Sequence, residues 1–321
     1  MRILSGIQPS GVLHLGNYFG MMKPSIELQN EGEAFYFIAD YHALTTLTDS
    51  ALLEQYARSV ALDFLACGLD PKKTVFFRQS AVPEIHELAW YLSTVTPLGL
   101  LERCHSYKDK IAQGIRPSHA LFAYPVLMAA DILMYDSEKV PVGQDQKQHL
   151  EVTRDIAQKF NDRFGPVFKI PEVVIREQTA TLPGIDGQKM SKSYGNTIEI
   201  FAEEKDFRKK VMSIKTDSTP VESPKPTKNS IILALAQCVA SPKEMEQMIA
   251  SMKAGGIGYG EYKKQLFDML WAYFAPFREK RRELEKNLDY VESALAEGGR
   301  KAREIAQKTL ARARKAVGMA P

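Results

Sequence analysis

Short apolar runs alternate with longer amphipathic segments along the first 200 residues of the chain. The runs are typical of strands that are buried on both faces of a parallel sheet. They predict strands at 3–4, 34–39, 74–77, 139–142 and 173–175. Apolar positions at helical spacing between the runs predict helices at 52–67, 82–94, 118–135 and 145–164. This order favours a parallel sheet with right-handed crossovers, which binds ligands beyond the carboxyl ends of its strands.

The pattern changes after about residue 200, where helical spacing continues without a strand-like run. It predicts helices at 205–214, 230–239, 242–253, 260–294 and 300–317. A polar segment with three prolines, 218–226, interrupts this part. We therefore expect an α/β protein with a Rossmann-like parallel-sheet domain at 1–199 and a smaller all-helical domain at 200–296. The last segment, 297–321, is expected to be a helix that joins the helical domain or packs back on the sheet domain.

The composition is that of an ordinary soluble globular protein. The chain has 321 residues, of which 45% are hydrophobic and 25% charged, enough for two domains. A net charge of +3 carries little information about nucleic acid, and the three cysteines lack the spacing of metal ligands or of a disulfide framework. No apolar run reaches the roughly 20 residues of a membrane span, and the N-terminus lacks the apolar core of a signal peptide. We expect a cytoplasmic protein with inert thiols and no membrane partner.

Two distant polar segments together suggest a phosphate site. His14-Leu15-Gly16-Asn17 follows the first strand and a turn rich in Gly, Pro and Ser, and it begins a predicted helix. The free N–H groups and the dipole of a helix start favour an anion. Lys189-Met190-Ser191-Lys192-Ser193 brings two ammonium groups into a loop between Gly187 and Gly195. Taken separately, the first segment could be a simple helix cap and the second a solvated turn, but together they suit a triphosphate.

An acidic residue, Asp131, lies in an otherwise apolar helical segment, with Tyr124 two helical turns earlier on the same side. Burying a carboxylate is unfavourable unless it accepts hydrogen bonds. One interpretation is a core acid that is paired with a neighbouring Tyr or Arg. The other is a recognition group for the single N–H donor of an apolar ligand.

Polar residues also follow two of the predicted strands. The segment 140–149 passes from a strand through Gly143 to Gln144, Asp145 and Gln146, where a parallel sheet usually holds ligands. The alternative is a helix cap by Asp145 with solvent-facing glutamines. His42 ends another strand, and the His149 imidazole later in the chain is expected to position other groups rather than to bind metal.

These motifs resemble a known family. The HxGN-type and KMSKS motifs are similar to those of class I aminoacyl-tRNA synthetases, and the segments 5–11, 128–133 and 140–149 resemble bacterial tryptophanyl-tRNA synthetases. The resemblance covers nearly the whole chain. It implies a ligase that activates L-tryptophan with ATP, releases pyrophosphate, and transfers tryptophan to the 3′ end of tRNA(Trp) in translation.

The resemblance also implies roles for individual residues. His14, Lys189 and Lys192 would stabilise the developing negative charge. ATP would contact Gln8, Pro9, Ser10, Gly16, Asn17, Gly143, Gln144, Asp145, Leu182, Lys189, Met190, Ser191, Lys192 and Ser193. Asp131 would accept the indole N–H, in a site completed by Tyr124, Met128, Val140, Val142 and Gln146. Mg²⁺ would accompany the phosphates of ATP, without a metal site made by the protein alone.

The C-terminal third provides weaker evidence for tRNA binding. Basic residues outnumber acidic ones from 277 to 315. They are Arg278, Lys280, Arg281, Arg282, Arg300, Lys301, Arg303, Arg312, Arg314 and Lys315. Such residues can follow phosphates, or they can form a solvated helix face with paired acids. The resemblance implies that the helical domain binds the tRNA anticodon, that the protein is a homodimer, and that DNA is not a partner.

Three other functions fit parts of the pattern. A tyrosyl-tRNA synthetase would share the fold and the chemistry, but it would need a second partner for a phenol. A nucleotidylyltransferase would activate a small acid without binding tRNA, and a retired paralogue would bind without catalysis. The complete set of phosphate-site residues argues against the last alternative.

Overall fold

The centre of the protein is a parallel sheet. The structure is a computed structural model that describes residues 1–112, 114, 116–142, 146–175 and 182–319. Within these residues the sheet has five strands in the order β3-β2-β1-β4-β5, with every adjacent pair parallel. The strands are β1 Arg2–Ile7, β2 Glu33–Ile38, β3 Thr74–Arg78, β4 Lys139–Val142 and β5 Glu172–Ile175. The predicted strands and the Rossmann-like α/β class are confirmed.

Helices connect and surround these strands. In the first part of the chain they are α1 Leu15–Asn17, α2 Lys23–Glu27, α3 Asp40–Ala43, α4 Ser50–Ala66, α5 Glu84–Ser93, α6 Leu98–Glu102, α7 His105–Ala112, α8 His119–Met134 and α9 Lys147–Phe164. Those that follow are α10 Glu204–Met212, α11 Ile231–Ala236, α12 Pro242–Ala254, α13 Tyr259–Tyr273, α14 Ala275–Glu285 and α15 Leu288–Ala316. Single turns of 3₁₀ or π helix lie at Tyr18–Met22, Leu28–Asn30, Gln79–Ala81 and Lys192–Tyr194.

The described chain divides into two compact units. Unit 1 comprises 1–11, 25–178 and 284–321, and unit 2 comprises 12–24 and 179–283. These bounds differ from the expected ranges 1–199, 200–296 and 297–321. The segments around His14 and Lys189 belong with the helical unit: the backbone of His14 pairs with Glu199 and that of Lys189 with Pro183, all within this unit.

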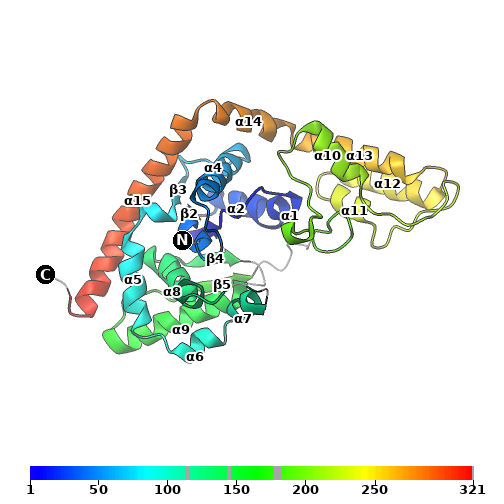
Figure 1. Ribbon diagram of the computed structural model, residues 1–321. Helices are drawn as coiled ribbons and strands as arrows, with labels where there is room; N and C mark the ends of the chain where they lie inside the picture. The colour runs from blue at the N-terminus through cyan, green and yellow to red at the C-terminus, as the bar shows by residue number, and fades with distance from the viewer. Residues whose placement is uncertain (113, 115, 143–145, 176–181, 320–321) are drawn as a thin grey trace. The chain divides into compact units, whose positions relative to one another are not determined.

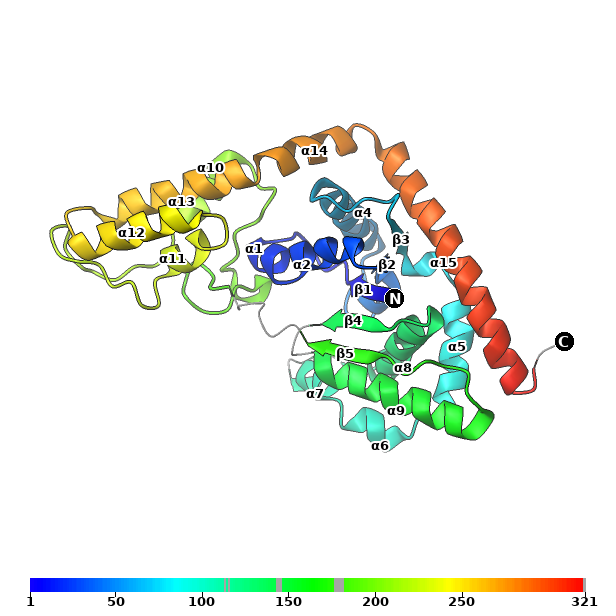
Figure 2. The same cartoon turned by 180° about the vertical axis from the view of Figure 1, so that it is seen from behind.

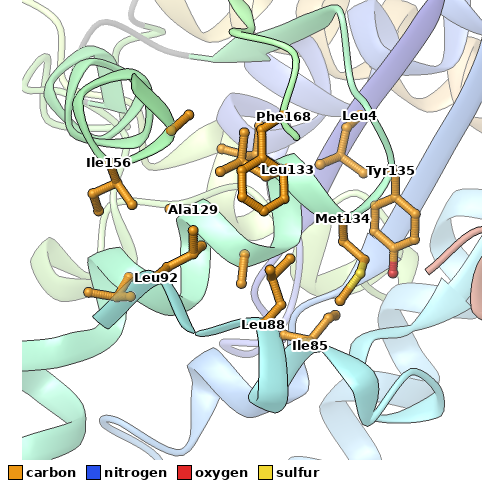
Figure 3. Close-up of a cluster of buried hydrophobic side chains, with 14 of the residues drawn as sticks. Leu4, Ile85, Leu88, Leu92, Ala129, Leu133, Met134, Tyr135, Ile156 and Phe168 are labelled. Carbon is orange, nitrogen blue, oxygen red and sulfur yellow. The ribbon is translucent and has the colours of Figure 1, made fainter. Parts of the chain in front are cut away.

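Unit 1 buries both faces of the sheet, as a doubly wound fold requires. Leu4 lies beside Phe35 in the register, and Phe37 beside Phe77, so one face is continuous and apolar. This face packs with α5, α8, α9 and α15 in one cluster, part of which Figure 3 shows. On the other face, the ring of Phe64 in α4 contacts the rings of Tyr36 and Phe76. Figure 2 shows α8 and α9 beside β4 and β5.

The last helix, α15, begins earlier than the sequence predicts and runs without a break through Gly298 and Gly299. Figure 1 shows it lying along β3 and α5. A Cβ at Gly298 would lie 1.9 Å from the carbonyl oxygen of Phe76, so only glycine allows the helix to approach the edge strand this closely. The expected boundary at 296/297 falls inside α15, because the two glycines serve packing and do not end the helix.

Unit 2 is formed mainly by helices. The predicted helix 260–294 is divided into α13, α14 and the start of α15. The rings of Phe207, Phe267 and Trp271 contact one another where α10 packs on α13. None of the helices in the described part of the chain is both long and apolar enough to cross a membrane.

Candidate active site

The carboxyl ends of the strands carry the first group of candidate residues. Gln8 follows β1, His42 lies in α3 directly after β2, and Gln79 is the first residue after β3. The Gln8 side-chain amide donates to the carbonyl of His42 at 3.2 Å. The strand order reverses between β1 and β4, and this switch point is where open α/β sheets bind ligands. The predicted residues Gly143, Gln144 and Asp145, which come after β4, lie outside the described residues.

Asp131 is the buried acid of this group, with 1% of its surface exposed. The Nε2 atom of His42 lies 2.8 Å from its Oδ2. The Nε2 atom of Gln79 lies 2.8 Å from Oδ1 and 2.9 Å from Oδ2. Among the residues that the structure describes, its hydrogen-bonding partners are therefore a histidine and a glutamine, and not the Tyr or Arg that the core-acid interpretation names. Sequence analysis did not identify Gln79, although its place directly after a strand was a usable signal.

Tyr124 lies on the same helix and meets a second histidine. Its hydroxyl is 2.9 Å from Nε2 of His149, and its ring packs edge-on against the rings of His149 and His42. Met128 and Val140 pack in the apolar cluster of unit 1, and Gln146 is the residue before α9. Thus Asp131, Tyr124 and His42 are brought together. The backbone of Val142 ends strand β4.

A buried tyrosine hydroxyl experiences the charge of Asp131. Tyr135 ends α8 with 0% exposure, and Figure 3 shows its ring among the apolar side chains. Burial, with the negative charges of Asp131 and Glu84, raises the pKa of Tyr135 well above its usual value. Its hydroxyl therefore remains protonated at neutral pH.

The second group of candidate residues lies in unit 2. His14 caps α1: its Nδ1 accepts from the Asn17 N–H at 3.3 Å, and its own N–H donates to Oδ1 of Asn17 at 3.4 Å. This reciprocal cap fixes the proton of the neutral imidazole on Nε2. Nε2 is therefore the donor that His14 can offer to an anion.

The two phosphate motifs lie side by side in unit 2. The Leu15 N–H donates to the carbonyl of Ile198 at 2.9 Å, and His14 pairs with Glu199 in an antiparallel bridge. The Gly16 N–H points to the sulfur of Met190 at 3.4 Å. A Cβ at Gly16 would lie 3.1 Å from the His14 ring, so glycine permits this close packing. Met190, the second residue of the lysine motif, is 4% exposed and contacts the first motif through its sulfur.

Asn196 organises the lysine motif, a role that the sequence did not reveal. Its Oδ1 accepts from the Ser191 N–H at 2.8 Å, and its Nδ2 donates to the Lys189 carbonyl at 3.0 Å and to Asp186 at 2.8 Å. The Ser191 and Ser193 hydroxyls are 2.8 Å apart. Leu182, 8% exposed, accepts from the Met190 N–H through its carbonyl. The loop is therefore closed by side-chain and backbone bonds around one buried amide.

The electrostatics of the phosphate motifs keep His14 neutral. His14 is 5% exposed, and burial, with a smaller contribution from the Lys192 charge, lowers its pKa to about 4. A neutral imidazole beside an ammonium group leaves the positive charge of the site on the lysines. At neutral pH His14 therefore acts as a hydrogen-bond donor and not as a cation.

Most of the basic residues in the C-terminal third that the structure describes in detail have partners within the protein. Arg303 binds Glu84 at 2.6 Å, Arg312 binds Asp136 at 2.6 Å, and Arg314 binds Glu87 at 2.5 Å. Arg278 is 7% exposed and lies 3.4 Å over the ring of Trp271. The expected phosphate stripe on the last helix is thus largely replaced by ion pairs that hold α15 to α5 and to the end of α8.

The described residues contain no group of three or more His, Cys, Asp or Glu side chains that could hold a metal ion.

Two cysteine thiols have raised pKa values. Burial raises the pKa of Cys104, and it raises the pKa of Cys238 to about 11. These thiols therefore remain protonated at neutral pH.

Comparison with known proteins agrees with this arrangement. A family model described as tRNA synthetases class I (W and Y) matches residues 1–275. A tryptophan–tRNA ligase of Fusobacterium nucleatum is 55% identical over 99% of this chain and 98% of its own length. One from Rhodopirellula baltica is 52% identical over 99% of this chain and all of its own. Among solved structures, the tryptophanyl-tRNA synthetase of Campylobacter jejuni complexed with ADP and tryptophan superposes on this chain with a TM-score of 0.95. The two sequences are 47% identical, and the match covers 99% of this chain and 100% of the other. The chain thus belongs to the class I tRNA synthetases of the tryptophan and tyrosine group.

Proposed function

We propose that this protein activates L-tryptophan with ATP and transfers the tryptophanyl group to the 3′ end of tRNA(Trp). The observation that carries the proposal is the buried carboxylate of Asp131, which lies in the apolar helix α8. The side chains of His42 and Gln79 hydrogen-bond to it from other elements. Indole offers one N–H donor on an otherwise apolar ring, and a buried acceptor selects for it. The full-length similarity to tryptophan–tRNA ligases supports the same substrate.

In this proposal the amino acid binds to unit 1 residues. Asp131 accepts the indole N–H, and Met128, Val140 and Val142 form apolar walls. Tyr124 and Gln146 hold the α-amino group. Phenylalanine leaves the acid without a partner, which disfavours it by about 1–3 kcal/mol.

The two phosphate motifs of unit 2 bind the triphosphate of the nucleotide. Gln8, Pro9, Ser10 and the residues 143–145 stay predicted ATP contacts, as the family resemblance implies. The tryptophan carboxylate attacks the α-phosphorus in line, a P–O bond to pyrophosphate breaks, and both electrons leave with pyrophosphate. The carboxylate is ionised at pH 7, so no general base is needed. Nε2–H of His14 and the ammonium groups of Lys189 and Lys192 stabilise the charge that develops on the phosphate oxygens. Mg²⁺ enters as part of the MgATP substrate.

The second step moves the tryptophanyl group from the adenylate to a hydroxyl of the terminal adenosine of tRNA, and AMP leaves. Unit 2 helices are the proposed contact for the anticodon. The expected homodimer remains a prediction, which sedimentation velocity of the purified chain would test.

ATP–pyrophosphate exchange with each amino acid offered separately tests the proposal. We expect exchange with tryptophan and little with tyrosine or phenylalanine. Asp131→Ala should reduce the preference for tryptophan by about 10- to 100-fold, with a small effect on the KM for ATP. Asp162→Ala, which removes an exposed acid on α9, is the matched control. Exchange that is equal for all three amino acids, or selectivity that survives Asp131→Ala, would contradict the proposal.

A further inference from the structure

The polar contacts of Asp131 are unequally divided between its two oxygens. Among the described residues, Oδ2 lies within hydrogen-bond distance of two donors, Nε2 of His42 at 2.8 Å and Nε2 of Gln79 at 2.9 Å. Oδ1 lies near one donor, Nε2 of Gln79 at 2.8 Å. Each carboxylate oxygen accepts about two hydrogen bonds. The remaining acceptor position is therefore on Oδ1.

Gln79 is itself held in one orientation. Its side chain is completely buried, with 0% exposure. The Tyr41 N–H donates to its Oε1 at 3.1 Å, which fixes the oxygen away from the acid and turns the NH₂ group toward both oxygens of Asp131. If the amide were reversed, two oxygens would face each other and the Tyr41 N–H would meet an NH₂ group. The backbone of α3 thus determines which end of Gln79 contacts the acid.

The position of Gln79 is also fixed along the chain. It directly follows Arg78, whose guanidinium forms two bonds of 2.7 Å with Glu292 of α15. Gly299 of the same helix lies against Ala81: a Cβ added to the glycine would be 2.8 Å from the Cβ of Ala81. Gln79 therefore lies in a short turn that is held at both ends by α15.

From these contacts we propose that Gln79 is a positioning residue for substrate selection: it orients Asp131 so that Oδ1 accepts the indole N–H of tryptophan. Gln79 acts through the acid and does not contact the ligand. This inference rests on the proposed function, because it assumes that Asp131 binds the indole.

The test compares two substrates in each variant. Tryptophan is measured against β-(benzothiophen-3-yl)alanine, in which sulfur replaces the indole N–H at nearly the same ring shape. The ratio of their kcat/KM values in pyrophosphate exchange reports the N–H bond and does not depend on the folded fraction of a preparation. We expect Gln79→Met to lower this ratio about tenfold, mainly through the KM for tryptophan. The KM for ATP should stay near that of the wild type.

Two further variants separate the donor from the volume of the side chain. Gln79→Glu keeps the size but replaces the NH₂ donor by oxygen, so it should lower the ratio at least as much as Gln79→Met. Gln158→Met removes the 2.7 Å bond from an exposed glutamine to Asp162 on α9, and should leave the ratio unchanged. Tyr41 keeps a partner in each Gln79 variant, because its N–H also donates to Asp40.

An unchanged ratio in Gln79→Met, or a retained ratio in Gln79→Glu, would overturn the inference. If the ratio falls in Asp131→Ala but not in the Gln79 variants, the inference fails while the proposed function stands. If the wild-type chain shows no exchange with tryptophan, the proposed function itself fails.

Discussion

Gly298→Ala is the sharpest structural prediction, because one methyl group would meet the backbone of the sheet. The new Cβ would lie 1.9 Å from the Phe76 carbonyl oxygen and 2.6 Å from its carbon. An ordinary C···O contact is about 3.3 Å, so the helix and the strand must separate by about 1.4 Å. Such a gap removes at least about half of the dispersion energy between the facing atoms of α15 and β3.

The expected free-energy change combines two opposing effects. Alanine favours a helix over glycine by about 1 kcal/mol. Overpacking disfavours the folded state by about 1–3 kcal/mol. The upper end of this range or more applies here, because the added methyl meets the backbone of β3, which cannot rotate away as a side chain can. We expect a net loss of about 2 kcal/mol in the free energy of unfolding, which corresponds to a fall of about 4–8 °C in Tm.

Differential scanning calorimetry of purified Gly298→Ala measures this loss. The matched control is Gly260→Ala in α13, where an added Cβ would meet nothing within 4 Å, and its Tm should stay equal or rise slightly. Since the turn with Gln79 follows β3 directly, Gly298→Ala should also raise the KM for tryptophan more than the KM for ATP. A variant as stable as the wild type would refute the close helix–strand contact.

Four further predictions concern charge and the lysine motif. Because folding lowers the pKa of His14 to about 4, the folded protein resists its protonation, and stability should fall as the pH decreases from about 6.5 to 4. Lys192→Ala should raise the midpoint of the His14 NMR titration but keep it below 6.5, since burial is the larger cause; an unchanged midpoint would exclude the charge effect. Asn196→Ala should lower the kcat of pyrophosphate exchange with little change in the KM for tryptophan, and a pure KM effect would contradict its role in the loop. Arg314→Ala should lower Tm and leave the KM for tRNA unchanged in charging assays, since its partner is Glu87; a large rise in that KM would show that it contacts tRNA.

The sequence by itself determined the strands, most of the helices of the sheet unit, and the motifs. Apolar runs bounded by turns gave the five strands, because a strand that is buried on both faces has to be apolar throughout its length. The residues His14 to Asn17, Lys189 to Ser193 and Asp131 could be selected for the same local reason. Each combines a residue type with a flanking pattern that suits a ligand site, although each pattern alone also fits a helix cap, a solvated turn or a paired core acid.

Tertiary structure alone decided which groups meet. Gln79 and Asp131 are 52 residues apart, and no local sequence pattern links them. The parallel pairing of the strands and the packing of α8 on the sheet bring the two side chains together. The sequence predicts separate helices on either side of Gly298 and Gly299, but in the structure these glycines lie within α15, and Gly298 lets it approach the backbone of Phe76 closely. The arginines of α15 resemble a phosphate-binding stripe until their carboxylate partners on α5 are placed opposite them. Hydrophobic periodicity is local and can be recognised along the chain, whereas the partner of a polar group depends on which distant segments the core brings together.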